Sequence, residues 1–274
     1  MERQKRIALV NDITGFGRCS VTVELPLISA MKIQACPLPT AILSVHTGFP
    51  DHYLDDYTSR MAPYIASWER NELDFDGICT GFLGSAEQIA IVLDFIRRFK
   101  KPQTKVMVDP VMGDYGKLYP SYTQEMCDKM RSLLTAADIV TPNLTEACQL
   151  LDIPYPEDGA VTDEELGNMA EELSRRGPKQ VVITGLHEDE TIKNFLYEKG
   201  KVSLVRVPKI GGDRSGSGDA FAAIVAASLI RGEHLEEAVK KAADFISKCL
   251  AYAEKLELPW NYGLPFEEYL TELR

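Results

Sequence analysis

The segment GGDRSGSGDAF, residues 211–221, is the stretch of this sequence that most narrows the choice of fold. Its glycines allow backbone N–H groups to turn toward a common point, and the apolar run AFAAIVAASLI begins at Ala220. N–H groups at the start of a helix bind anions, and the helix dipole reinforces this binding. The segment therefore predicts an anion hole at a helix N-terminus.

Asp219 lies beside this predicted anion hole. Its carboxylate can accept the proton of a substrate hydroxyl while the N–H groups stabilise charge on a transferring phosphoryl group. The alternative is a glycine-rich turn in which the aspartate only caps the helix. Two other nucleotide signatures do not fit. The chain has no Gly-Lys-Ser or Gly-Lys-Thr of a P-loop, and Gly15 and Gly17 lack the third glycine and the acidic residue of a dinucleotide fingerprint.

Strand-like and helix-like segments alternate along the rest of the chain. Short apolar and β-branched runs predict strands, and the segments of helical period between them indicate a parallel sheet covered on both faces. Two strand-like runs within residues 191–208 flank Lys199-Gly200-Lys201 and predict a hairpin. We expect one α/β domain over residues 1–274, with a mostly parallel sheet that has an antiparallel end. The expected strands are 7–10, 40–44, 75–81, 105–109, 137–142 and 179–185, and the expected helices are 86–99, 121–134, 143–151, 163–176, 218–231, 234–256 and 265–273.

Polar residues follow the ends of these predicted strands. Ligands of open α/β sheets bind at the carboxyl ends of parallel strands, so polar residues there are candidates for a site. Each of them alone is also an ordinary turn or helix-capping residue, and only their joint occurrence favours a site. The segments are Asn11-Asp12, Ser44-Val45-His46-Thr47, Thr80-Gly81-Phe82, Asp109-Pro110, Thr141-Pro142-Asn143 and Thr184-Gly185.

Two segments carry carboxylates that suit Mg²⁺. DPVMGD (109–114) and TPNLTEA (141–147) place Asp109 and Glu146 at or just beyond a strand end. Mg²⁺ keeps several waters and takes few protein ligands, so one or two carboxylates can hold it directly or through water. Asp-Pro and an Asn at a helix start are also common turn signals, which is the structural alternative for both segments.

The composition indicates a globular protein with a small ligand. The 274 residues include 30 Lys and Arg against 41 Asp and Glu, and the formal charge of -11 would repel nucleic acids and anionic membranes. The six scattered cysteines lack a C-x-x-C pair and indicate reduced thiols in the cytosol rather than a zinc site or disulfides. The start MERQKRIALVND has too few apolar residues for a signal peptide, and no stretch approaches a membrane span. We therefore expect a cytoplasmic protein.

In their order along the chain, these segments resemble the ribokinase-like superfamily and, within it, the pyridoxal kinases. The resemblance covers nearly the whole chain and is carried by VNDITGFGRCS, ILSVHTGF, CTGFLGS, VDPVMGD, TPNLTEA, VITG and GSGDAF. It implies a three-layer sandwich with helices on both faces of the sheet. It also implies an ATP-dependent kinase that phosphorylates the 5′-hydroxymethyl group of pyridoxal, pyridoxine or pyridoxamine in B6 salvage. Mg²⁺, assistance by K⁺ and a homodimer belong to the same expectation.

The resemblance also assigns roles to residues. Asp219 matches the catalytic base. His46 lies between two substrate-contacting positions, where a wall or a satisfied polar group is a better expectation than a proton shuttle. The expected anion hole consists of Gly216, Ser217 and Gly218; Asp109 and Glu146 organise Mg²⁺ and the phosphates; Asn143, Thr184 and Gly185 line the ATP phosphate path; and Asp12, Ser44, Thr47 and Phe82 surround the pyridine ring.

Two positions depart from the family pattern and leave the preferred vitamer open. Many pyridoxal kinases have Ser at the position of Asp12 and Tyr at the position of Phe82. A carboxylate at Asp12 can accept from a phenolic O–H or pair with a protonated ring nitrogen. Two alternative functions also stay open. One is a hydroxymethylpyrimidine kinase of thiamine synthesis, which shares DPVM and GSGD-like segments, and the other is a non-catalytic vitamer-binding protein on the same fold.

Overall fold

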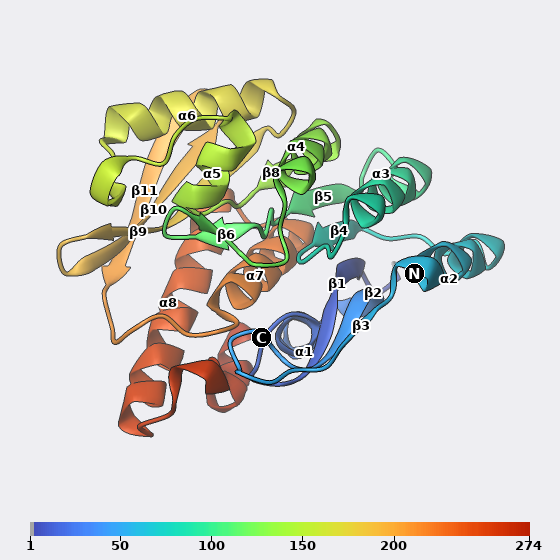
Figure 1. Ribbon diagram of the computed structural model, residues 1–274, viewed down its shortest axis with the longest axis horizontal. Coiled ribbons are helices and arrows are strands. Elements are labelled where there is room, and N and C mark those ends of the chain that lie inside the picture. Colours follow the sequence, from blue (N-terminus) through green and yellow to red (C-terminus); the bar gives the residue numbers. More distant parts are fainter. Residues whose placement is uncertain (1–2) are drawn as a thin grey trace.

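A nine-stranded sheet forms the centre of the computed structural model, which describes residues 3–274 (Figure 1). Neighbouring strands follow the order β11-β10-β9-β8-β5-β4-β1-β2-β3. In that order they are β11 (Lys201–Pro208), β10 (Thr191–Glu198), β9 (Gln180–Glu188), β8 (Ile139–Val140), β5 (Lys105–Val108), β4 (Gly77–Thr80), β1 (Arg6–Phe16), β2 (Gln34–Val45) and β3 (Leu54–Asp56).

The pairing is parallel through the middle of the sheet and antiparallel at both edges. β1 pairs in parallel with β2 and β4, and the parallel ladder continues through β5 and β8 to β9. β10 and β11 form the predicted antiparallel hairpin. The predicted mixed sheet is therefore confirmed. The short antiparallel edge strand β3 has no counterpart among the strands expected from the sequence.

Helices cover both faces of the sheet and give the expected three layers (Figure 1). One face packs against α1 (Val21–Ala30), α7 (Ser217–Arg231) and α8 (Leu235–Lys255). The opposite face packs against α2 (Thr58–Arg70), α3 (Ala86–Phe99), α4 (Gln124–Leu133), α5 (Leu144–Leu151) and α6 (Asp163–Arg175).

Two of these helices lie outside the expected set. α1 contains Pro26 and α2 contains Pro63, and an internal proline removes a backbone donor and argues against a helix. The helix expected at 265–273 is a 3₁₀ segment, η4 (Glu267–Leu273). The remaining short elements are η1 (Leu134–Ala136), η2 (Glu157–Gly159), η3 (Trp260–Tyr262) and the two-residue strands β6 (Gly113–Asp114) and β7 (Lys117–Leu118).

Side chains of β1 alternate between two cores. Ile7 and Leu9 pack into the core under α1 and α7, while Ala8 and Val10 pack into the core of the opposite layer. Burying a side chain such as Leu9 contributes about 1.5–3 kcal/mol. Because side chains of this strand pack into both cores, the position of the polar residues that follow Val10 at the carboxyl edge of the sheet is well defined.

β1 and β2 extend beyond the strands beside them. β4 pairs with β1 only as far as Val10, whereas β2 stays paired with β1 to Phe16, with a register shift between Asn11 and Ile13. The prediction that the first strand ends at Val10 is therefore wrong, and Asp12 lies at an irregularity inside the strand rather than after it. Pairing with β2 satisfies the backbone, so the polar residues do not terminate the strand.

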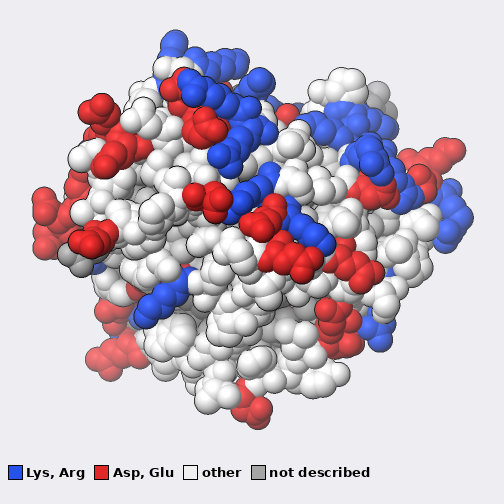
Figure 2. Space-filling view, turned by 45° about the horizontal axis from the view of Figure 1, so that its top comes forward, with Lys and Arg blue, Asp and Glu red and all other residues white. Residues whose placement is uncertain are grey.

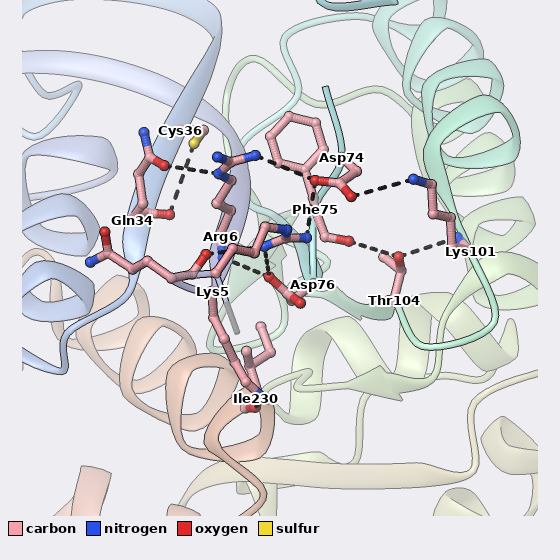
Figure 3. Close-up of polar contacts among 12 residues, drawn as sticks. Lys5, Arg6, Gln34, Cys36, Asp74, Phe75, Asp76, Lys101, Thr104 and Ile230 are labelled. Atoms are coloured by element: carbon pink, nitrogen blue, oxygen red, sulfur yellow. Dashed lines mark hydrogen bonds and ion pairs between the residues drawn. The ribbon is translucent and has the colours of Figure 1, made fainter. Parts of the chain in front are cut away.

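The amino edge of the sheet is held by a polar network (Figure 3). Asp76 accepts a hydrogen bond from the backbone N–H of Arg6 at 2.8 Å, and the Arg6 guanidinium lies 3.4 Å from Asp74. Thr104 donates its hydroxyl to the Phe75 carbonyl at 2.8 Å. These contacts join the segments that lead into β1, β4 and β5, and the candidate functional residues lie at the opposite edge.

Charged side chains of both signs lie on the surface. Figure 2 shows Lys and Arg interspersed with Asp and Glu on one face of the molecule, and a lower part of that face with few charges. All six cysteines are free. Within residues 3–274, none of the helices combines the length and apolar character that crossing a membrane requires.

Candidate active site

The glycine-rich segment ends at the first turn of α7. Gly216 is the N-cap of this helix and has a φ of 81°, a left-handed conformation that glycine adopts readily. A Cβ on Gly216 would lie 2.0 Å from the carbonyl oxygen of Arg18, so a larger residue does not fit without movement of the backbone. At Gly218, by contrast, a Cβ would meet only open space. Close contact with the loop between β1 and α1 therefore fixes the start of α7.

Free backbone N–H groups form part of the predicted anion hole. Among the described residues, the N–H groups of Gly216 and Gly218 have no hydrogen-bond acceptor, whereas the Ser217 N–H donates to the Arg214 carbonyl at 3.3 Å. The Ser217 hydroxyl donates to the same carbonyl at 2.9 Å. Together with the dipole of α7, the free donors can stabilise an anion.

Asp219 lies in the first turn of α7 and is half-buried. Its Oδ1 accepts a hydrogen bond from Nδ2 of Asn11 at 3.2 Å. Burial raises the pKa of Asp219 to about 6, and hydrogen bonds from the Ser20 N–H and Asn11 oppose this rise. A carboxylate with a pKa near the working pH can take up a proton in the reaction and release it afterwards, which suits a general base.

Asp109 follows β5 and is almost fully buried. The Thr141 hydroxyl lies 3.4 Å from its Oδ1. Burial and the nearby Asp219 carboxylate raise the pKa of Asp109 well above its ordinary value. The two aspartates therefore share one electrostatic environment, in which a cation would favour the ionised form of both.

Glu146 and Asn143 form a capping box at the start of α5. Oε2 of Glu146 accepts the Asn143 backbone N–H at 2.8 Å, and its Oε1 accepts the Met112 N–H at 3.2 Å. The Asn143 side chain accepts from the Glu146 N–H at 2.9 Å and donates to the Gly113 carbonyl at 2.8 Å. Burial and the charge of Asp109 raise the pKa of Glu146. Glu146 thus has a structural role in holding the DPVMGD and TPNLTEA segments together.

The two predicted metal ligands fit Mg²⁺ unequally. No group of three or more acidic, His or Cys side chains in residues 3–274 is arranged to hold a metal. Mg²⁺ often uses one or two carboxylates and several waters, however. Asp109 fits this pattern because its Oδ2 has no hydrogen-bond partner in the described chain. Both oxygens of Glu146 already accept backbone N–H groups, so water-mediated contact with a cation is the role that remains open to it.

The structure brings the predicted phosphate-path residues together. Asn143 lies just after β8 and Thr184 lies within β9, and the two residues form a parallel bridge. The Thr184 N–H donates to the Pro142 carbonyl at 2.9 Å. Gly185 is exposed, has a φ of 69° and leaves open space around it. This group lies two strands from β5 in the sheet, so Asp109 and the phosphate path share the carboxyl edge.

The residues predicted to surround the ring lie on the extended part of β1 and β2 and after β4. The Asp12 oxygens accept hydrogen bonds from the Ser20 and Thr14 hydroxyls, both at 2.6 Å. Ser44 accepts the Tyr53 N–H at 2.9 Å and is exposed. Thr47 is exposed, and Phe82 is half-buried. These side chains reach the same edge of the sheet, while Asp12 is buried beneath it.

His46 is a satisfied polar group, as expected. Its Nδ1 accepts the Gly48 N–H at 3.1 Å, which places the ring proton on Nε2, 2.8 Å from the Asn261 carbonyl. The ring therefore ties the end of β2 to the segment around η3. That C-terminal segment carries no strand-end motif, and the sequence offered no signal for its approach to the site.

Three further residues near Asp219 have no role among the site residues that the family resemblance assigns. Asn11 contacts Asp219 directly, and its place in a strand-end pair is the signal that could have identified it. Ser20 precedes α1 and donates to Asp12. Glu24 lies inside α1 and is 1% exposed, with no hydrogen-bond partner for Oε2 among the described residues. A single acid in the apolar run VTVELPLISA is the signal for Glu24.

Comparison with known proteins agrees with this geometry. The phosphomethylpyrimidine kinase family matches residues 28–262. The chain belongs to this family. A hydroxymethylpyrimidine/phosphomethylpyrimidine kinase from Haemophilus influenzae is 31% identical over 200 residues, which cover 71% of this chain and 70% of that relative.

Solved structures of the phosphomethylpyrimidine kinase family and of pyridoxal kinases share this fold. A provisionally assigned phosphomethylpyrimidine kinase from Bacteroides thetaiotaomicron, solved in an orthorhombic form with pyridoxal, is 40% identical; the match has a TM-score of 0.95 and covers 99% of this chain and 96% of that one. Pyridoxal kinase from Lactobacillus plantarum is 26% identical with a TM-score of 0.91, over 99% and 97% of the two chains. The ribokinase-like fold is therefore confirmed. The protein is a kinase of the family that is related both to hydroxymethylpyrimidine kinases and to pyridoxal kinases.

Proposed function

We propose that this protein transfers the γ-phosphoryl group of ATP to the 5′-hydroxymethyl group of a B6 vitamer: pyridoxal, pyridoxine or pyridoxamine. The observation that carries the proposal is the half-buried Asp219 beside the free N–H groups of Gly216 and Gly218. The choice of a vitamer is supported by the 40% identical Bacteroides thetaiotaomicron protein that was solved with pyridoxal.

In the proposed reaction, the oxygen of the 5′-hydroxymethyl group attacks the γ-phosphorus, and Asp219 accepts the proton of that hydroxyl group. The bond between the γ-phosphorus and the bridging oxygen breaks, and ADP leaves with the electron pair of that bond. The N–H groups at the start of α7 stabilise the charge on the transferring group. Phosphoryl transfer depends mainly on positioning and on charge stabilisation, so a site made of positioned carboxylates, backbone N–H groups and a metal ion is sufficient.

Asp109 and Glu146 are our candidates for organising Mg²⁺, with Asp109 the more direct of the two. Bound Mg²⁺ supplies positive charge against the phosphates. Asn143, Thr184 and Gly185 are the candidates for the ATP phosphate path. Assistance by K⁺ and a homodimer also belong to the proposal; a K⁺ titration of the rate and sedimentation equilibrium would test them.

Ser44, Thr47 and Phe82 remain our candidates for contact with the ring, and His46 for a wall of the site. Ser44 and Thr47 are exposed at the end of β2, and Phe82 is half-buried after β4. Contact of Asp12 with the ring stays a prediction, because its oxygens are engaged by Thr14 and Ser20.

A second candidate function is phosphorylation of hydroxymethylpyrimidine. It is favoured by the family match over residues 28–262 and by the Haemophilus influenzae relative. A vitamer-binding protein without catalysis is a third reading. The arrangement of Asp219 at the start of α7 weighs against it, since simple binding does not require a base there.

A steady-state assay with ATP and Mg²⁺ tests the proposal. We expect kcat/KM for at least one of pyridoxal, pyridoxine and pyridoxamine to exceed that for hydroxymethylpyrimidine. A larger kcat/KM for the pyrimidine than for every vitamer would replace our proposal with the second candidate. Tight pyridoxal binding without ADP formation from any substrate would establish the binding protein.

A further inference from the structure

Asn11 is buried against the carboxylate that we propose as the base. The side chain is 1% exposed, and its Nδ2 donates to Oδ1 of Asp219 at 3.2 Å. A Cβ added at Gly81 would fall 2.4 Å from that same Nδ2, so the amide fills the space beside β4. Asn11 therefore has little freedom to move away from Asp219.

The orientation of the Asn11 amide is determined by its other hydrogen bonds. Its Oδ1 accepts the backbone N–H of Phe82 at 2.8 Å and that of Asp12 at 2.9 Å. Two backbone donors require the oxygen on that side, so the NH₂ group must face Asp219. The Asn11 side chain also opposes the rise in the pKa of Glu24 that burial causes.

Ser20 joins Asp12 to the start of α1. It is the residue before α1, and its φ of 55° and ψ of -141° are rare for a residue with a side chain. The backbone N–H of Ser20 lowers the pKa of Asp219. The Ser20 hydroxyl donates to Oδ1 of Asp12 at 2.6 Å. A conformation of this kind persists only where neighbouring contacts enforce it.

We infer that Asn11 is a positioning residue that orients the Asp219 carboxylate. The inference rests on the proposed role of Asp219 as the base. A carboxylate whose Oδ1 is held by a fixed donor keeps its other oxygen directed at the substrate hydroxyl. Small errors in this direction reduce the rate of proton transfer steeply.

The test replaces Asn11 by Asp, which keeps the shape and the acceptor oxygen but removes the donor. We expect Asn11→Asp to lower kcat by about tenfold or more with little change in KM for ATP. The new carboxyl should also move the acid limb of kcat/KM to higher pH, by on the order of one pH unit, because a like charge raises the pKa of Asp219. Asp12, Glu24 and Asp109 also face Asp219, and they are unchanged in the variant.

Controls separate this role from a purely structural one. Asn11→Ser removes the amide without adding charge and should also lower kcat. Ser228→Ala removes a buried hydroxyl of α7 that has no partner in the described residues, and it should leave kcat and the pH profile unchanged. Circular dichroism and thermal melting show whether each variant folds. A folded Asn11→Asp with wild-type kcat and an unmoved acid limb would overturn the inference.

A second background distinguishes failure of this inference from failure of the proposed function. In Asp219→Asn there is no base to orient, so adding Asn11→Ser should cause no further loss of kcat. An equal loss from Asn11→Ser in both backgrounds would show that Asn11 acts elsewhere and would overturn its positioning role. Full turnover by Asp219→Asn itself would instead remove the base from the proposed mechanism.

Discussion

The carbonyl oxygen of Arg18 lies 2.0 Å from the place that a Cβ on Gly216 would occupy. This contact joins the loop between β1 and α1 to the start of α7. The same loop continues to Ser20, whose backbone N–H lowers the pKa of Asp219. The backbone of Gly216 and the electrostatic environment of the base therefore depend on one short segment of chain.

Gly216→Ala should destabilise the protein far more than Gly218→Ala. At Gly216 the added methyl group meets backbone and must adopt a φ of 81°, whereas at Gly218 it points into open space. We expect Gly216→Ala to reduce the free energy of unfolding by about 1–3 kcal/mol, and Gly218→Ala to change it by less than about 0.5 kcal/mol. Urea denaturation of both variants measures this. Equal losses would mean that the contact with Arg18 relaxes without cost.

Asp219→Asn should lower kcat by about 100-fold or more while folding and ATP binding stay near normal. The wild-type kcat/KM should rise with pH through about 6, because the base must be ionised and burial raises its pKa to that value. The residual activity of the variant should lack this limb. A pH profile of both proteins between pH 5 and about 8 checks the prediction. Full turnover by Asp219→Asn would show that a group other than Asp219 accepts the proton of the substrate hydroxyl.

The metal prediction concerns Asp109 and Glu146. Asp109→Asn should raise the Mg²⁺ concentration for half-maximal rate, since it removes the carboxylate with a free oxygen. The sequence predicts the same for Glu146→Gln, and weakening the capping box adds a loss of about 1 kcal/mol in stability. Mg²⁺ titrations of both variants, with thermal melts, separate the roles. An unchanged Mg²⁺ requirement in Glu146→Gln would leave Glu146 with capping alone.

The sequence was sufficient for the parallel centre of the sheet, for helices α3 to α8 and for the place of Asp219, because these depend on local periodicity and on a glycine-rich turn. α3, for instance, spans the expected residues 86–99. It was not sufficient for α1, where Pro26 and a nearly uniform apolar run hide the helical period. Nor could it place Asn11 against Asp219, since that contact joins residues separated by 208 positions through the packing of α7 on β1.

Glu24→Gln should stabilise the protein increasingly as pH rises. Burial, followed by the charge of Asp219, raises the pKa of Glu24 well above its ordinary value. The folded state therefore binds a proton that the unfolded state releases above about pH 4.5, and stability is lost as pH rises beyond that point. Glutamine carries no such proton. We expect a gain of about 1 kcal/mol or more at pH 8 and little gain at pH 5.

Urea denaturation at both pH values measures the effect, with the exposed Glu190→Gln as the matched control. The difference in the free energy of unfolding between this control and the wild type should be the same at the two pH values. A Glu24→Gln variant whose stability parallels the wild type at both would show that Glu24 stays ionised in the folded protein.

Asp12→Asn distinguishes a contact with the substrate ring from support of the base. If the carboxylate faces the ring, as the sequence indicated, replacement of Asp12 shifts the ratio of kcat/KM among the three vitamers several-fold, on the order of 1 kcal/mol. The structure favours a different result, because the Ser20 and Thr14 hydroxyls occupy the two oxygens at 2.6 Å. Loosening Ser20 disturbs Asp219 whichever vitamer is bound. We therefore expect kcat to fall about equally, within about twofold, for pyridoxal, pyridoxine and pyridoxamine, with a smaller effect on KM for ATP. Unequal losses would show that Asp12 contacts the substrate ring. Wild-type rates for all three vitamers would show that Asp12 neither contacts the ring nor supports Asp219.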